Sequence, residues 1–91
     1  MTEENKDALI EAMTENLQML RVRLGLTQAQ LSQMIGVGRQ TYMAIETKKK
    51  KMPWNTFLSL LIVFTKNKET DIILNATGIY TDELNDFLQR K

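Results

Sequence analysis

Residues 27–46 read TQAQLSQMIGVGRQTYMAIE, and they carry the strongest structural signal in the chain. Thr27 is followed three positions later by Gln30, the spacing of a capping box, in which each side chain bonds a free backbone N–H of the first helical turn. Gly36 follows the last apolar residue of this segment, where a helix commonly ends in the left-handed conformation that glycine adopts easily. A second helix opens near Gly38 and Arg39. The stretch therefore predicts two short helices joined by a tight turn, which is a helix-turn-helix.

The apolar residues of this stretch predict which faces of the two helices are buried. Four residues of the first helix are expected to point inward: Ala29, Leu31, Met34 and Ile35. Val37 fills the corner, and the second helix buries Ile45 and Tyr42, whose hydroxyl lies at the edge of the core. Five residues of the second helix are left with outward or flanking directions: Arg39, Gln40, Thr41, Met43 and Ala44. Met43 is interpreted as partly buried packing, and the others are candidates for contacting a ligand.

The rest of the chain is also expected to be helical. Thr2 caps a first helix that runs toward Leu24 and carries an apolar stripe at three- and four-residue spacing: Leu9 or Ile10, Met13, Leu17, Leu20 and Leu24. Met52, Pro53 and Trp54 start a helix that continues to Phe64 and is apolar nearly all round, so it needs cover on more than one side. Taken alone, this run also fits a buried strand, but the proline turn favours a helix.

Two short helices are expected after a polar break at residues 65–68. The first contains Asp71 to Ala76 and ends at Gly78; the second is capped by Thr81 or Asp82 and finishes with Gln89 and the cationic residues Arg90 and Lys91. The predicted fold class is all-α, a compact bundle of about five to six helices that contains the helix-turn-helix.

Composition limits the chemistry that this chain can perform. Its 91 residues make one small domain and include no cysteine and no histidine. We therefore expect no disulfide, no metal site, no cofactor and no enzymatic activity. The longest apolar run, residues 60–64, is too short to span a bilayer, and the polar, acidic N-terminus does not resemble a secretory signal. A cytoplasmic protein without a membrane partner is expected.

Charge is distributed unevenly along the chain. The formal charge is −4 over residues 1–20, +6 over residues 21–51 and −1 over residues 52–91, although the net charge is only +1. The positive block coincides with the helix-turn-helix. A surface that faces phosphates explains this coincidence, because neutralising phosphates releases counterions and provides affinity for nucleic acid.

Three segments of the sequence carry a family resemblance, namely Leu24 to Ala29, Gly36-Val37 and Ile45-Glu46. Together they resemble the Xre-type DNA-binding domains, which are relatives of the phage Cro and cI repressors. The resemblance covers about residues 17–64 and implies a lambda-repressor-like fold. It divides the chain into an extension of the first helix at residues 1–16, a helix-turn-helix domain at 17–65, and C-terminal helices at 66–91. Both terminal parts either pack on the chain's own core or form a dimer contact.

The resemblance also implies roles for individual residues. Arg39, Gln40 and Ala44 occupy the places from which relatives reach base edges, Thr41 is a weaker candidate, and Arg39 could instead hold a phosphate. Phosphate contacts are expected for Thr27, Gln28 and some of the four lysines after the second motif helix, with the choice among the lysines left open: Lys48, Lys49, Lys50 and Lys51. For Thr27, capping alone is an equally good interpretation. Arg21 and Glu46 are expected to form a partly buried ion pair, while Arg23 stays exposed.

The function that these observations favour is sequence-specific binding of double-stranded DNA by a transcriptional regulator. The resemblance implies a homodimer on an inverted repeat, with the second motif helix in the major groove, that represses by excluding polymerase. Two alternatives remain at this stage. One is an antitoxin or other protein-interaction module that binds DNA for autoregulation, and the other is an antirepressor-like or purely structural interaction protein.

Overall fold

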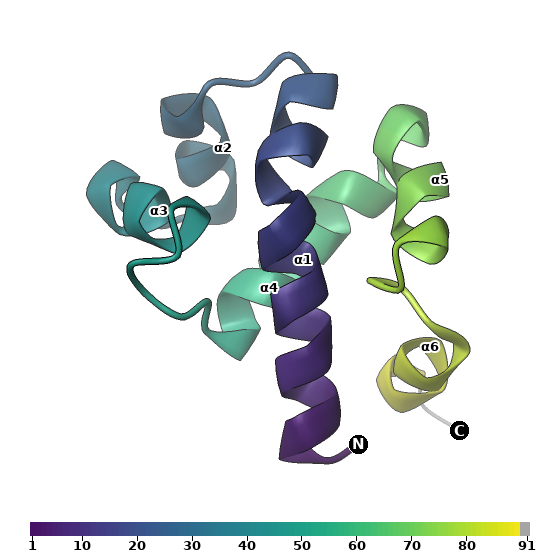
Figure 1. Cartoon of the computed structure of the whole chain (residues 1–91). Coiled ribbons are helices and arrows are strands. Elements are labelled where there is room, and N and C mark those ends of the chain that lie inside the picture. The colour runs from purple at the N-terminus through teal and green to yellow at the C-terminus, as the bar shows by residue number, and fades with distance from the viewer. Residues whose placement is uncertain (90–91) are drawn as a thin grey trace.

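The computed structural model of the protein describes residues 1–89 and contains six helices in this range, α1 Glu3–Arg23, α2 Gln28–Ile35, α3 Arg39–Glu46, α4 Trp54–Thr65, α5 Lys68–Ala76 and α6 Asp82–Leu88. The all-α prediction is confirmed. Figure 1 shows α1 running along the length of the molecule, with α2 and α3 on one side, α5 and α6 on the other, and α4 crossing behind. The expected cationic end at 90–91 lies outside the described residues.

Helix α1 supplies the central strip of the core. Thr2 caps it by accepting a hydrogen bond from the backbone N–H of Asn5, and its apolar stripe is buried, with Met13, Leu17 and Leu20 fully inaccessible. The buried side chains of α3, α4 and α5 meet this stripe, among them Tyr42, Phe57, Phe64 and Leu74. The first helix therefore holds the helix-turn-helix and the C-terminal helices on one shared core.

Helix α4 is covered by α1, α2 and α5, as its apolar circumference requires. Phe57, Leu60 and Phe64 are fully buried, but Ile62 remains 61% exposed. Helix α5 begins at Lys68, so the last residue of the expected polar break is helical. The Asn67 carbonyl oxygen accepts from the backbone N–H groups of Thr70 and Asp71, which begins the helix at Lys68. The buried Thr70 hydroxyl donates to the backbone oxygens of Phe64 and Asn67 and joins the two helices.

Helix α6 is fastened to the beginning of α1. Thr81 caps α6, and the Asn5 side-chain amide donates to the Glu83 carboxylate over 2.6 Å. The Lys6 ammonium lies 5.3 Å from the Trp54 ring centroid and 5.8 Å from that of Phe87, within the range of cation–π attraction. The N-terminal part of α1 thus contacts both α4 and the C-terminal helix of its own chain.

Two of the residues expected to point inward from α2 are exposed. Met34 is 55% accessible and Ala29 is also exposed, whereas Leu31 and Ser32 are buried. The helix turns by about 100° per residue, so Gln28, Leu31, Ser32 and Ile35 define its inward direction, and Ala29 and Met34 each lie roughly 110° away from it. Ser32 fits on the buried face because its hydroxyl donates to the Ala29 carbonyl oxygen over 2.8 Å. The prediction for Ala29 and Met34 was therefore wrong.

The turn between α2 and α3 depends on the backbone of Gly36, whose φ of +75° lies in the left-handed region. A Cβ at this position would meet nothing within 4 Å, so only the backbone conformation disfavours a side chain. We predict that Gly36→Ala lowers the free energy of unfolding by about 1 kcal/mol. Urea denaturation followed by circular dichroism measures this change.

Gly38 provides the matched control, because it caps α3 with an extended backbone and no side-chain hydrogen bond. Gly38→Ser should leave stability unchanged or raise it by a few tenths of a kcal/mol (~0.3), since serine is a good helix cap. Equal destabilisation by both substitutions would contradict the role assigned to the left-handed turn.

Candidate nucleic-acid interface

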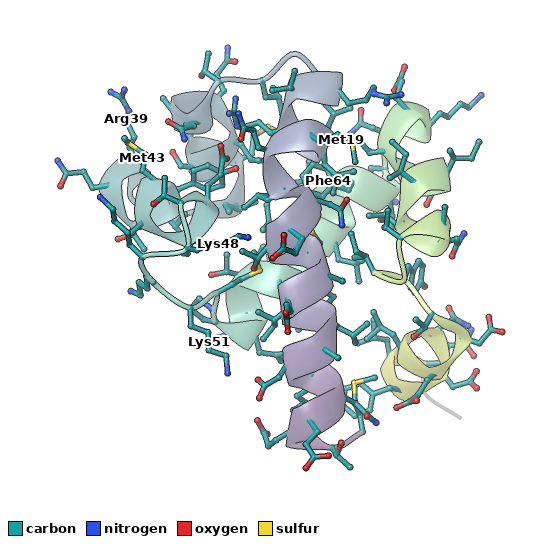
Figure 2. The ribbon with its side chains drawn as sticks, viewed as in Figure 1. Met19, Arg39, Met43, Lys48, Lys51 and Phe64 are labelled. Carbon is teal, nitrogen blue, oxygen red and sulfur yellow. The ribbon has the colours of Figure 1, made fainter. Side chains whose placement is uncertain are left out.

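Helix α3 presents a polar face to the outside of the molecule. Tyr42 and Ile45 are fully buried and anchor the helix, as predicted, while Arg39, Gln40 and Thr41 are exposed on its first turn. Figure 2 shows Arg39 and Met43 on the side of α3 that faces away from α1. Met43 is 37% exposed and Ala44 is half-buried. The helix therefore offers a guanidinium, an amide and a hydroxyl to a partner.

The orientation of α3 is fixed by the carboxylate of its last residue, Glu46. Arg21 of α1 donates to both carboxylate oxygens over 3.0 Å, from Nε and from Nη2. Tyr42 donates its hydroxyl to the same carboxylate, and Gln28 of α2 donates its side-chain amide over 3.3 Å. Arg21 also donates to the Leu26 carbonyl oxygen before α2. The expected Arg21–Glu46 pair is present, and its carboxylate joins three helices.

Burial and hydrogen bonding act together on the ionisation of this cluster. The side chains of Arg21 and Glu46 are only 12% and 6% exposed. Burial pushes the pKa of Glu46 upward, but the hydrogen bonds from Arg21 and Tyr42 and the arginine charge outweigh it, so this pKa lies below its usual value. Hydrogen bonding to Glu46 raises the pKa of Arg21, while burial raises that of Tyr42. Arg21 and Glu46 are charged and Tyr42 is protonated at neutral pH.

We predict that Glu46→Gln lowers the free energy of unfolding at pH 7 by about 3 kcal/mol, because it leaves the Arg21 charge buried without its partner. The lowered pKa of Glu46 means that the unfolded chain binds the proton more readily. Its stabilising contribution is therefore complete above the pKa of an unfolded glutamate, about 4.3, and disappears as pH falls through the lower pKa of the folded state.

Urea denaturation from pH 7 to pH 3 measures both effects. The Glu46→Gln protein should lose less stability on acidification than the wild type, and Glu4→Gln, at an exposed position of α1, should retain the wild-type profile. An unchanged acid dependence in the Glu46→Gln protein would contradict the proposed coupling.

The beginning of α2 contains the two non-lysine candidates for phosphate contact. Thr27 and Gln30 form the expected capping box, in which Thr27 accepts from the Gln30 N–H over 3.0 Å and Gln30 accepts from the Thr27 N–H over 2.9 Å. Gln28 is half-buried and donates to Glu46. This contact has no signal in the sequence, because neither periodicity nor charge identifies the partner of a glutamine.

The four lysines after α3 are divided between two directions. The Lys48 ammonium lies 2.7 Å from the Glu15 carboxylate, and the Lys51 ammonium lies 2.7 Å from that of Asp7. Lys48 has a φ of +68°, a left-handed conformation that costs a residue with a side chain about 1 kcal/mol. Figure 2 shows Lys48 directed toward α1. Sequence reasoning treated the lysines as one group because these ion pairs span 33 and 44 residues.

Lys49 lies on the other side of the loop. It lines a hollow on the outer surface with Gln40, Met43, Ala44 and Thr47, whereas Lys48, Lys50 and Lys51 line a groove against α1. Within residues 1–89, neither Lys49 nor Lys50 has an ion-pair partner. The structure therefore brings one lysine to the outer face of α3 and directs two others to acidic side chains.

Residues 17–61 match a family model described as helix-turn-helix. This segment contains the C-terminal half of α1, all of α2 and α3, and most of α4. It is an Xre-type, Cro/cI-like helix-turn-helix, the motif of DNA-binding regulators. No curated protein and no solved structure matched the chain. No helix within residues 1–89 has the length and apolar character needed to cross a membrane.

Proposed function

We propose that this protein is a transcriptional repressor that binds a specific sequence of double-stranded DNA with α3 in the major groove. The observation that carries this proposal is the exposed polar face of α3, held on a buried anchor within a helix-turn-helix. In such a motif the second helix lies in the major groove, and its N-terminal residues contact base edges. Arg39 and Gln40 stand at that end of α3.

Direct reading of bases follows from the side-chain chemistry of this face. Arg39 can donate two hydrogen bonds to guanine O6 and N7, and Gln40 can bond adenine N6 and N7. The methyl group of Ala44 suits the methyl of thymine, and Thr41 offers either a hydroxyl or a methyl. Arg39 and Gln40 are therefore proposed as the main base-reading residues, with Thr41 and Ala44 as secondary contacts.

Phosphate contacts are proposed for the residues on either side of this helix. Thr27 and Gln28 stand at the N-terminal end of α2, where backbone N–H groups and the helix dipole favour an anion. Gln28 can approach a phosphate while Glu46 orients its amide. Among the lysines, Lys49 is the leading candidate because it shares a hollow with Gln40 and Ala44. The other three lysines line the groove against α1, so they can contact a phosphate only if the duplex reaches that groove: Lys48, Lys50 and Lys51.

We further propose that two copies bind an inverted repeat. One domain of this size reads only a few base pairs, and a symmetric dimer places two recognition helices in successive major grooves about 34 Å apart. Three large apolar side chains outside α3 are at least 59% exposed and support contact with a second copy: Val22, Ile62 and Ile72. A dimer on such a site would repress by excluding polymerase, and we propose that it acts in the cytoplasm.

Selection of preferred duplexes from a random DNA pool tests this proposal. The wild-type protein should enrich a palindromic site, and sedimentation of the complex should give two chains per duplex. Arg39→Ala and Gln40→Ala should each weaken binding to that site by about 1–3 kcal/mol and relax the preference at one base position. Arg23→Ala removes the same charge from an exposed position of α1 and serves as the control for Arg39→Ala.

Each result has a definite meaning. A base preference that is unchanged in both α3 variants would assign recognition to other residues. No enrichment at low or moderate salt would overturn the proposal and redirect attention to a protein partner for the exposed apolar side chains.

A second prediction concerns the lysine loop. Lys49→Ala should weaken binding to all duplexes to a similar extent and reduce the slope of log affinity against log salt by about 0.9, the value for one phosphate contact. Fluorescence anisotropy over a series of KCl concentrations measures this slope. Lys68→Ala, an equal charge change on α5, should leave it unchanged. An equal loss in both variants would show that Lys49 acts only through net charge.

A further inference from the structure

A groove with opposite charges on its two sides separates the lysine loop from the first half of α1. Three carboxylates at four-residue spacing line α1, namely Asp7, Glu11 and Glu15, and we call them the acidic face. Lys48, Lys50 and Lys51 line the other side, and Ile10 and Met52 lie between. The groove has a volume of about 380 Å³. The acidic face is thus placed against the most cationic segment of the chain.

The ion pairs across this groove do not determine the path of the loop. Its backbone is already tied to α3, since the Lys49 and Lys50 N–H groups donate to the Ala44 carbonyl oxygen over 2.8 and 3.1 Å. The Lys48 N–H donates to the Ile45 carbonyl oxygen over 3.1 Å. The carboxylates of Glu15 and Asp7 instead determine where the ammonium groups of Lys48 and Lys51 lie, and they neutralise part of the positive charge of these groups.

We propose that the acidic face lowers the non-specific affinity of this protein for DNA by competing with phosphates for Lys48 and Lys51. A carboxylate and a phosphate oxygen are both anionic acceptors, and each ammonium lies at 2.7 Å from a carboxylate. Any phosphate contact by these lysines must displace that partner. The affinity that comes from phosphates alone is thereby reduced, and contacts with bases contribute a larger share of binding.

The position of the acidic residues supports competition rather than chance pairing. Asp7 and Glu11 belong to the part of α1 that precedes the helix-turn-helix segment 17–61, as does Glu15. Residues 1–16, which precede the matched segment, continue α1 past the lysine loop. Figure 2 shows Lys48 and Lys51 beside this part of α1. All four paired side chains are more than half exposed, so they exchange readily with another anion. The inference rests on the proposed DNA-binding function.

The test compares the Asp7→Asn/Glu15→Gln protein with the wild type on a random-sequence duplex of about 20 base pairs over a series of KCl concentrations. The variant should bind roughly fivefold more tightly at low salt, because exposed ion pairs contribute little each and two are removed. Its salt slope should steepen by up to about 1.8, corresponding to two additional phosphates.

Two controls separate competition from a change in net charge. Glu4→Gln/Asp86→Asn removes the same charges from side chains that make no hydrogen bond or ion pair within residues 1–89, and it should change affinity much less. Adding Lys48→Ala and Lys51→Ala to the Asp7→Asn/Glu15→Gln protein should abolish the gain. Thermal unfolding of each variant verifies that the domain is folded.

The outcomes distinguish this inference from the proposed function. The inference alone would be overturned if the wild type binds DNA and the affinity rises equally in the Asp7→Asn/Glu15→Gln protein and in the charge control. It would also be overturned if the rise in affinity survives removal of the two lysines. A complete absence of binding by all folded proteins at low salt would overturn the proposed function and the inference with it.

Discussion

The structure depends on one buried carboxylate, that of Glu46, which receives donors from three helices. Arg21 reaches it from α1, Gln28 from α2, and Tyr42 from within α3. A buried anion is costly unless it is paired and hydrogen-bonded, so the carboxylate is stable only when all three helices are in place. Because Glu46 is the last residue of α3, the same contact that satisfies the charge also sets the angle at which Arg39 faces outward. Packing of Tyr42 and Ile45 then fixes the rotation of the helix.

Most of the fold is predictable because the signals are local or periodic. The capping box at Thr27, the left-handed Gly36 and the apolar stripe of α1 each depend on residues within a few turns of one another, and all three are present. The Arg21–Glu46 pair is different, because nothing local connects two residues 25 positions apart. It was predicted only because resemblance to the Cro and cI repressors places an arginine and a glutamate at these positions. The contact of Tyr42 with Glu46 had a local signal in its four-residue spacing on one helix, whereas the contact of Gln28 with Glu46 had none.

Prediction failed where the answer depended on the direction of a short helix or on a distant partner. Helix α2 has only eight residues, so two apolar side chains at its flanks, Ala29 and Met34, could not be distinguished from its core face by spacing alone. The lysine loop is a stronger example. Four identical neighbouring side chains have the same sequence signal, yet a left-handed backbone at Lys48 and the carboxylates of α1 direct two of them away from the outer surface of α3.

The division of the lysines bears on how a small DNA-binding domain discriminates among sequences. Phosphates are the same at every site, so each lysine that reaches one strengthens the wrong complexes as much as the right one. Under the proposed function, α3 has few side chains with which to offset this by base contacts, since its first turn carries one arginine and one glutamine. On the proposed competition, holding two cations against carboxylates would reduce the phosphate contribution that all sites share and would leave the proposed base contacts unchanged. Under this proposal, the acidic face of α1 and the cationic loop therefore form one unit, in which the balance of opposing charges would determine how much of the binding energy depends on sequence.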